Sequence, residues 1–229
     1  MDKKEVREKA IRQIFEETSL IDKGYKCTKN SIYKKDEDFK LSLNFSSAIS
    51  ANRIEEVNYL DVRASISHER LRKYKKEKIN QDSGYIGGAA IANLFKAGPP
   101  WISYDLGITS ESYSEKLKLI KQTVEKDVFH FFDEFKKIER INSYIWQPCF
   151  DLRSTIHLYV FLNEKELLDE VIRKASIDRK DTFKDNYINF NRRLISGKAW
   201  IEVYKDVKDG EDSLALEIAN SFFEMGIEL

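Results

Sequence analysis

The chain has 229 residues, a length that suits one large domain or two small ones. Charged residues make up 34% of it, but 39 lysines and arginines balance 39 aspartates and glutamates. A nucleic-acid-binding domain usually carries a basic excess, so this balance disfavours nucleic acid as a partner. No apolar run has the length of a membrane span, and the N-terminus lacks the apolar stretch of a secretory signal. We therefore expect a cytoplasmic protein without a membrane segment.

The residues that most often bind metals or catalyse reactions are few and scattered. The two cysteines, Cys27 and Cys149, offer neither zinc-site spacing nor a disulfide framework. None of the three histidines, His68, His130 and His157, has a second histidine or a cysteine three or four residues away. The chain has no GxSxG serine motif and no SxxK motif in a suitable setting. The sequence thus predicts no metal, no cofactor and no catalytic residue.

The spacing of apolar residues in the first part of the chain predicts a helix followed by strands. Residues 3–21 carry apolar side chains at helical intervals, and Gly24 suits a position just after a helix. A short strand is expected around Cys27, where apolar and polar residues begin to alternate. The clearest strand covers residues 39–45, where four apolar residues alternate with polar ones.

Another strand is expected at residues 60–66, which alternate in the same way. Val57 and Tyr59 are out of phase with that set, which predicts a bulge or bend near Tyr59. The short connections between these strands favour an antiparallel meander. The basic residues 68–78 that follow predict a short helix or an exposed extension of the strand.

Residues 79–100 contain four glycines and end in two prolines. This composition predicts the longest irregular segment of the chain, a flexible connection with a brief helix at residues 89–95. Alternation at residues 102–108 predicts one more strand. Residues 112–138 then show apolar side chains at steps of three and four, the strongest periodic signal of the sequence.

After residue 140 the patterns are mostly helical. Helices are expected at residues 152–160, through residues 187–194 and from Leu214 onward, and Asn163 followed by Glu166 resembles a capping box that opens another. Residues 199–207 fit either a strand or a helix.

Together these elements predict an α+β fold. An antiparallel meander sheet carries the N-terminal helix and the long central helix on one face, because a sheet with one apolar face needs such a cover. Residues 1–140 form the sheet domain. Residues 141–229 form a helical C-terminal half, either as a packed extension or as part of one continuous domain.

One stretch resembles a known family. A helix is followed by Gly24-Tyr25-Lys26, then Ile32-Tyr33-Lys34-Lys35, then Phe39-Lys40-Leu41-Ser42-Leu43-Asn44-Phe45. This order resembles the uncharacterised bacterial domain of unknown function 4304 family, and the aromatic helix at residues 128–135 fits the same layout. The resemblance covers about residues 5–140. It implies an accessory or immunity-type protein and transfers no catalytic residue.

The leading hypothesis is therefore a non-catalytic binding protein with a protein partner, such as a toxin that it neutralises. Aromatic side chains are frequent binding anchors, and the candidates are Tyr85, Trp101 and Trp146.

Two alternatives from other classes remain open. One is an enzyme whose site is assembled from His68 or His157 and a distant carboxylate. The other is a nucleic-acid accessory protein that uses the basic segment at residues 70–78. The cations of that segment are Arg70, Arg72, Lys73, Lys75, Lys76 and Lys78.

Overall fold

The computed structural model describes residues 3–47, 59–95, 103–105, 110–176, 180–196 and 213–225. They form an α+β fold with a helical C-terminal half, as predicted. The chain divides into two compact units. The sheet unit comprises Met1–Glu69, Tyr85–Arg140 and Trp146–Phe150, and the helical unit comprises Arg70–Gly84, Ile141–Ile145 and Asp151–Leu229. The predicted domain boundary at residue 140 stays a prediction.

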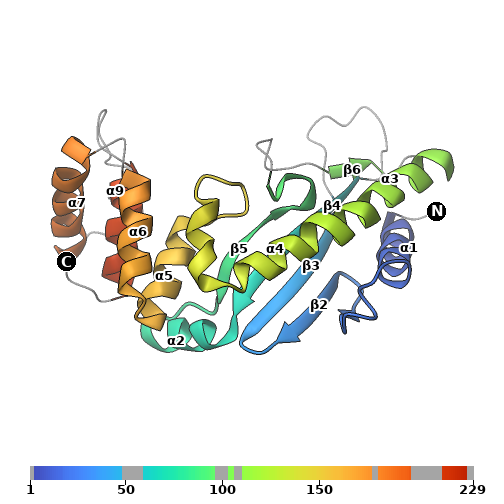
Figure 1. Cartoon of the computed structure of the whole chain (residues 1–229), viewed down its shortest axis with the longest axis horizontal. Coiled ribbons are helices and arrows are strands. Elements are labelled where there is room, and N and C mark those ends of the chain that lie inside the picture. Colours follow the sequence, from blue (N-terminus) through green and yellow to red (C-terminus); the bar gives the residue numbers. More distant parts are fainter. Residues whose placement is uncertain are drawn as a thin grey trace. The chain divides into compact units, whose positions relative to one another are not determined.

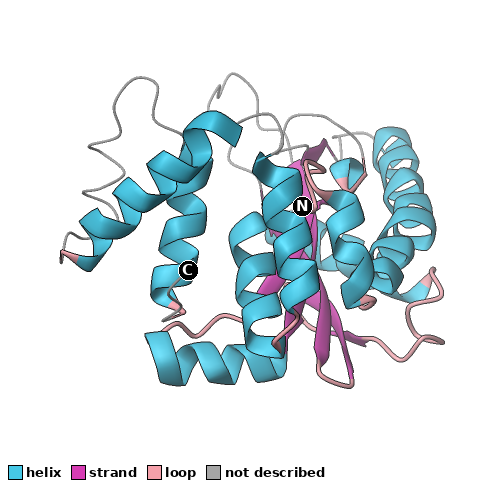
Figure 2. Cartoon of the chain, turned by 60° about the vertical axis from the view of Figure 1, so that its left-hand side comes forward, coloured by secondary structure: helices cyan, strands magenta, loops and turns pink. Residues whose placement is uncertain are grey.

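The sheet unit contains one antiparallel sheet of six strands in the described residues, seen as a single layer in Figure 2. Strands β1 to β5 lie side by side in chain order, and β6 pairs with β4, so the predicted meander is confirmed. The strands are β1 (Lys26–Cys27), β2 (Ser31–Asp36), β3 (Phe39–Ser47), β4 (Tyr59–His68), β5 (Tyr85–Ala90) and β6 (Ser103–Asp105).

The strand register gathers the apolar residues on one face. Leu43 of β3 lies opposite Ile32 of β2 and Ala64 of β4, and all three side chains are buried. Because side chains alternate along a strand, the residues two positions away fall on the same face and extend this core.

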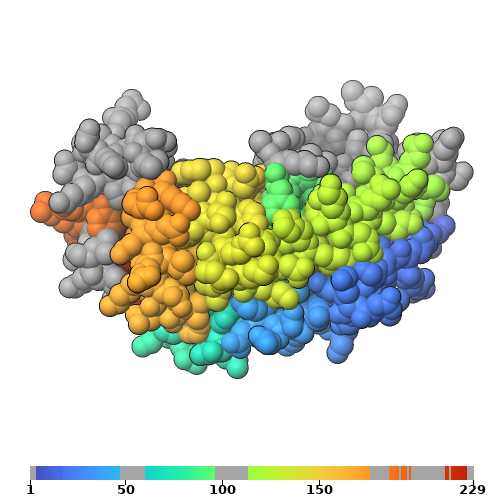
Figure 3. Space-filling model, viewed as in Figure 1, coloured from blue at the N-terminus to red at the C-terminus, as the bar shows by residue number. Residues whose placement is uncertain are grey.

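Two helical segments cover the apolar face. They are α1 (Lys3–Glu16) and a continuous rod made of α3 (Ser110–Thr123), the π-helical turn η2 (Val124–Val128) and α4 (Phe129–Phe135). The rod crosses the strands in Figure 1, and its side chains form the outer layer in Figure 3. From η2, the carboxylate of Glu125 accepts hydrogen bonds from the backbone and the hydroxyl of Ser19, 2.5 and 2.8 Å away, and so fixes the turn after α1.

One local expectation in this unit was wrong, and another is tested only in part. Helix α1 ends at Glu16 rather than at residue 21, and turns connect it to Gly24, whose φ of 79° suits glycine. From Tyr59 onward β4 pairs regularly with β6, and the residues just before Tyr59 lie outside the described ranges. A bulge lies in β5, where Ile86 is inserted between the pairs Ile66–Gly87 and Ser67–Tyr85.

The glycine segment differs in part from the prediction. Residues 85–90 form strand β5 in place of a flexible connection, the brief helix expected at residues 89–95 is a 3-10 turn, η1 (Ile91–Asn93), and residues 96–100 lie outside the described ranges. The glycines serve close packing instead of flexibility. A Cβ atom at Gly87 would lie 2.6 Å from a ring carbon of Phe135 and 2.7 Å from the carbonyl oxygen of Cys149.

The helical unit contains α5, α6, α7 and α9, most of α2, and part of the 3-10 turn η3. Their bounds are α2 (Glu69–Ile79), η3 (Ile138–Tyr144), α5 (Leu152–Leu162), α6 (Lys165–Ser176), α7 (Lys180–Ile195) and α9 (Ser213–Glu224). The basic segment is thus a helix, one of the two predicted alternatives. The expected helix or strand at residues 199–207 lies outside the described residues.

Caps define the ends of α5. Asp151 precedes the helix, and its carboxylate accepts a hydrogen bond from the backbone nitrogen of Ser154 at 2.7 Å. Asn163 ends α5 with a left-handed φ of 59°, so it is the C-cap of α5 and not the N-cap of α6 that the capping-box pattern predicted.

Candidate functional site

The most exposed large hydrophobic side chain in the described part of the chain is Trp146, with 67% of its surface accessible. Its backbone has a φ of 72°, in the left-handed region that bulky residues rarely occupy. Strained backbone of this kind persists only where surrounding contacts hold it, and it is concentrated at functional sites. Both observations single out Trp146, one of the three predicted anchors.

The segment that follows Trp146 is fixed to strand β5. The backbone nitrogen of Gly88 donates a hydrogen bond to the carbonyl of Cys149 at 3.0 Å, and Gly87 forms a β-bridge with Phe150. Cys149 is fully buried, and burial raises the pKa of its thiol to about 12. Trp146 therefore stands three residues from a rigid attachment point, and all of these residues belong to the sheet unit.

Of the other two predicted anchors, the structure describes only Tyr85. Tyr85 is half-buried at the start of β5, and its hydroxyl donates a hydrogen bond to the carbonyl of Gly88 at 3.1 Å. Trp101 lies outside the described residues.

The six cations of the basic segment have different surroundings. Lys75 is buried, whereas Arg72 forms two hydrogen bonds with Asp82 and Lys76 lies 3.9 Å from the same carboxylate. Helical spacing places Arg72, Lys73 and Lys76 on the side opposite the buried residues, together with the exposed Glu77. Asp82 and Glu77 offset part of the positive charge of this face, and Arg70 and Lys78 of the same helix are exposed as well.

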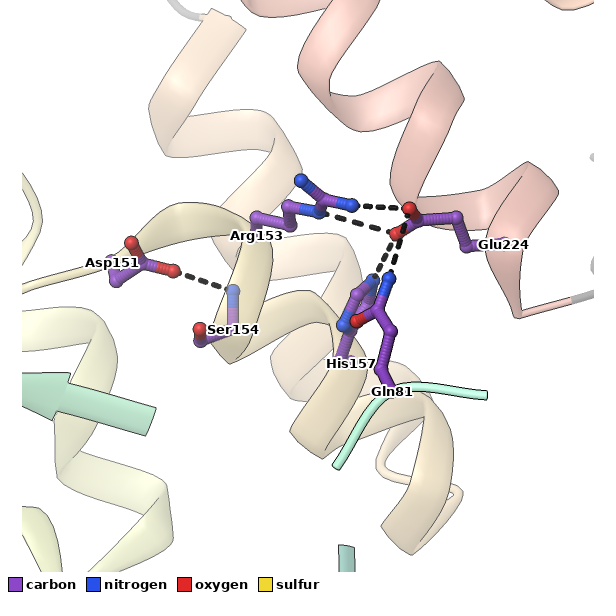
Figure 4. Close-up of polar contacts among 6 residues, drawn as sticks. All are labelled: Gln81, Asp151, Arg153, Ser154, His157 and Glu224. Atoms are coloured by element: carbon purple, nitrogen blue, oxygen red, sulfur yellow. Dashed lines mark hydrogen bonds and ion pairs between the residues drawn. The ribbon is translucent and has the colours of Figure 1, made fainter. Parts of the chain in front are cut away.

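A partly buried polar cluster in the helical unit contains His157, which the sequence had paired with an unnamed carboxylate. Glu224, the last residue of α9, accepts hydrogen bonds from both Nε and Nη2 of Arg153 and from Nε2 of Gln81 at 3.3 Å (Figure 4). His157 lies on the same side, with its Nε2 atom 3.2 Å from Oε2 of Glu224. We call Gln81, Arg153, His157 and Glu224 the Glu224 cluster.

Charge and burial determine how the Glu224 cluster titrates. Burial lowers the pKa of His157 and outweighs the opposing effect of Glu224, while Lys75 and Arg153 lower it further. Burial alone would raise the pKa of Glu224, but His157 and Arg153 bring it below its ordinary value. Burial and the neighbouring Arg153 also lower the pKa of Lys75.

The cluster has the His–carboxylate pairing that the enzyme alternative required, but not an accessible one. Only 1% of the His157 side chain is exposed, so in this structure no substrate can reach a proton on its ring. His68 is buried against Phe39 in the sheet unit, and His130 packs on Phe95. The histidines thus lie in three separate environments.

A pocket of about 560 Å³ lies between α1 and the turn after β1. Its walls include Arg12 and Glu16 of α1, together with Cys27 and Lys29. Burial raises the pKa of the Cys27 thiol, with a smaller lowering by Arg12, so the thiol is mostly protonated near neutral pH and is a weak nucleophile. Cys27 is half-buried rather than enclosed in the core.

Within the described ranges, no three His, Cys, Asp or Glu side chains are grouped as metal ligands. None of the helices in those ranges has both the length and the apolar character needed to cross a bilayer.

Comparison with known proteins adds no family: no protein-family model, no curated protein and no solved structure matches this chain. The resemblance at residues 5–140 therefore stays a prediction.

The sequence could identify Trp146 as a candidate by residue type, because tryptophan is a frequent binding anchor. It could not reveal the left-handed backbone, since Trp146 is not a residue type that favours this region. The Glu224 cluster carries no motif, because Glu224 is separated from Arg153 by 71 residues and from Gln81 by 143.

Proposed function

We propose that this chain is a non-catalytic protein-binding protein and that Trp146 is the central anchor of its binding surface. The observation that carries the proposal is an indole that is 67% exposed on a backbone with a φ of 72°. Leaving a tryptophan in water forfeits burial worth about 1.5–3 kcal/mol for a large apolar side chain. A protein partner that covers the indole recovers this free energy.

Tryptophan is among the residues that most often dominate binding energy at protein interfaces. Its two side-chain torsions lose little entropy on binding, and a rigid attachment lowers that loss further. The hydrogen bond between Gly88 and Cys149 supplies such an attachment close to Trp146. The balanced charge of the chain fits an interface centred on an aromatic residue better than one centred on an electrostatic patch.

For the partner we propose a toxin that this protein neutralises. This part rests on the resemblance to the domain of unknown function 4304 family, which implies an immunity-type protein in bacteria.

The test compares three versions of the purified full chain as bait in extracts of the source cells: wild type, Trp146→Ala and Leu119→Ala. Leu119 lies on α3 of the same unit and is 47% exposed, so Leu119→Ala controls for loss of any exposed apolar side chain. Proteins captured by wild type and by Leu119→Ala but not by Trp146→Ala are then purified, and their dissociation constants are measured by calorimetry.

We expect Trp146→Ala to weaken binding by about 30-fold, which corresponds to about 2 kcal/mol for a hot-spot residue. Equal affinity of the purified partner for wild type and Trp146→Ala would remove Trp146 as the anchor. A captured partner without toxic activity on cells would leave the anchor in place and overturn the immunity-type assignment.

A further inference from the structure

The two faces of the sheet differ in their cover. Helix α1 and the rod lie over the apolar face, and the strand register assigns the polar residues between the apolar ones to the opposite face. On that opposite face Lys35, Asn44 and Arg63 are exposed, and Tyr33 and Lys40 are half-buried. We call the face that carries these residues the open face.

Two lysines lie directly opposite each other on the open face. Lys35 of β2 pairs with Lys40 of β3, next to the turn that joins the two strands. The backbone nitrogen of Phe45 donates a hydrogen bond to the carbonyl of Asn30, and bonded and non-bonded pairs alternate along antiparallel strands. The Lys35–Lys40 pair is therefore a non-hydrogen-bonded one, with Cα atoms about 4.5 Å apart. Like charges placed directly opposite each other destabilise a sheet.

The carboxylates of the β2–β3 turn do not neutralise this pair. Asp36 accepts a hydrogen bond from Lys136 at 2.8 Å, and Asp38 lies 4.0 Å from the buried His68, so both are engaged on the covered face. Glu37 between them is exposed. Among the described residues, neither Lys35 nor Lys40 forms an ion pair. An anion bound at the two lysines would relieve their repulsion.

An aromatic ring and a third cation adjoin the lysine pair. Tyr33 lies two residues before Lys35 on the same face, and Nζ of Lys40 is 5.6 Å from the centroid of its ring. Lys26 of the edge strand β1 is the register partner of Tyr33 and is exposed. We call Lys26, Tyr33, Lys35 and Lys40 the open-face cluster.

The charge of the open face is unevenly distributed. The three lysines of the open-face cluster lie at the end near the β2–β3 turn, whereas Asp61 lies toward the other end of β4, where its carboxylate accepts a hydrogen bond from Ser46 at 3.3 Å. The serines Ser42 and Ser65 lie between the two ends. The equal numbers of cations and anions in the whole chain therefore conceal a local excess of lysines.

We propose that the open-face cluster binds single-stranded nucleic acid, with phosphates on its three lysines and a base stacked on Tyr33. Lysines bind phosphates through charge, and an aromatic ring offers a stacking surface to any base. An acidic protein surface can contact the lysines as well, but the ring among them favours nucleic acid. The site is separate from Trp146 and from the basic segment at residues 70–78, and it does not depend on the function proposed for Trp146.

The experiment measures binding of the full chain to a labelled oligouridylate of about 12 nucleotides by fluorescence anisotropy. Titrations are run between about 0.05 M and 0.2 M salt, because phosphate contacts are salt-dependent. Wild type is compared with Lys35→Gln/Lys40→Gln and with Lys118→Gln/Lys126→Gln. Lys118 and Lys126 are exposed on the rod, which covers the other face, so this control removes the same charge elsewhere in the unit.

Three phosphate contacts predict a slope of about −2 for log K against log salt, since each contributes about −0.7 on a single strand. We expect Lys35→Gln/Lys40→Gln to bring the slope to about −0.7 and to weaken binding about tenfold or more at the lowest salt. Lys118→Gln/Lys126→Gln should keep the wild-type values. The proposal fails if wild type does not bind at about 0.05 M salt, or if both double variants lose affinity equally.

Tyr33→Leu tests the stacking separately from the charge. We expect about fivefold weaker binding or more, with the salt slope unchanged, because stacking releases no counterions. Unchanged affinity would remove base stacking and with it the preference for nucleic acid. An oligoglutamate peptide that competes as well as the oligonucleotide would assign the lysines to an acidic protein instead, and equal affinity for an RNA duplex would contradict single-strand binding.

A conservative variant separates loss of binding from loss of folding. Lys35→Arg/Lys40→Arg keeps both charges and should bind like wild type, whereas Lys35→Gln/Lys40→Gln should unfold at the same or higher urea concentration, because it removes a like-charge pair. Binding by the arginine variant that is no better than that of the glutamine variant would overturn the assignment of phosphates to these two positions.

Discussion

Trp146 has two unfavourable properties at one position: an exposed indole and a left-handed backbone. For residues with a Cβ atom, left-handed conformation costs about 1–2 kcal/mol, because the Cβ atom approaches the following carbonyl oxygen. Glycine would suit this backbone better than tryptophan. This mismatch between residue and conformation is the feature that supports a role in binding.

Substitutions at Trp146 test the backbone strain directly. We expect Trp146→Gly to be more stable than Trp146→Ala by about 1 kcal/mol, because glycine accepts a positive φ without the Cβ clash. The free energy of unfolding is measured by urea denaturation of both variants. At ordinary helical positions alanine is the more stabilising of the two, so an alanine variant as stable as the glycine variant would argue against a strained left-handed backbone.

At the scale of the element, strand β5 is where sequence and structure differ most. The dipeptide Gly87-Gly88 suggested a flexible connection, because glycines are frequent in loops. In the structure these glycines allow close approach: Gly87 leaves space for Phe135 and the carbonyl of Cys149, and Gly88 lies against Ala64. Glycine has the same sequence signature in both roles, so only the tertiary neighbours distinguish them.

Gly87→Ala tests this packing. The added Cβ would lie 2.6 Å from a Phe135 ring carbon and 2.7 Å from the Cys149 carbonyl oxygen, so the strand or the segment 146–150 must shift. We expect a loss of about 2–3 kcal/mol in the free energy of unfolding, the range for an overpacked core.

Gly24→Ala is the control for that variant. It has a positive φ of 79° but nothing within 4 Å of the added atom, so it should lose only about 1 kcal/mol from backbone strain. Similar losses in the two variants, measured by urea denaturation, would contradict a packing role for Gly87.

Across the whole molecule, elements with a regular apolar period were predictable and the candidate site was not. The alternation at Phe39, Leu41 and Leu43 gave strand β3, and the steps of three and four gave the helical rod that covers the sheet. These signals are local in sequence. The Glu224 cluster depends on residues 71 and 143 positions apart, and the exposure of Trp146 depends on tertiary contacts, so neither leaves a periodic trace.

The balance of charge is a property of the whole chain, with an isoelectric point near 6.9. A protein with almost no net charge has little electrostatic repulsion between copies. We expect solubility to be lowest near pH 7 and to rise on either side, as measured by light scattering against pH. Raising the salt from about 0.1 M to 1 M shortens the Debye length from about 10 Å to 3 Å and should flatten this minimum. A minimum far from neutral pH would mean that the exposed charges are not balanced.

The attachment of Cys149 and Phe150 to β5 affects how easily the sheet could pair with the sheet of another copy. Strand β5 ends the main strand order, and an uncovered strand of this kind can pair with the same strand of another copy. The segment 146–150 occupies part of that edge through Gly87 and Gly88. A chain cut at residue 140 would lack this cover, and intermolecular strand pairing would then compete with folding. A chain that ends at the domain boundary predicted from the sequence, residue 140, would thus have a sheet edge that is open to aggregation.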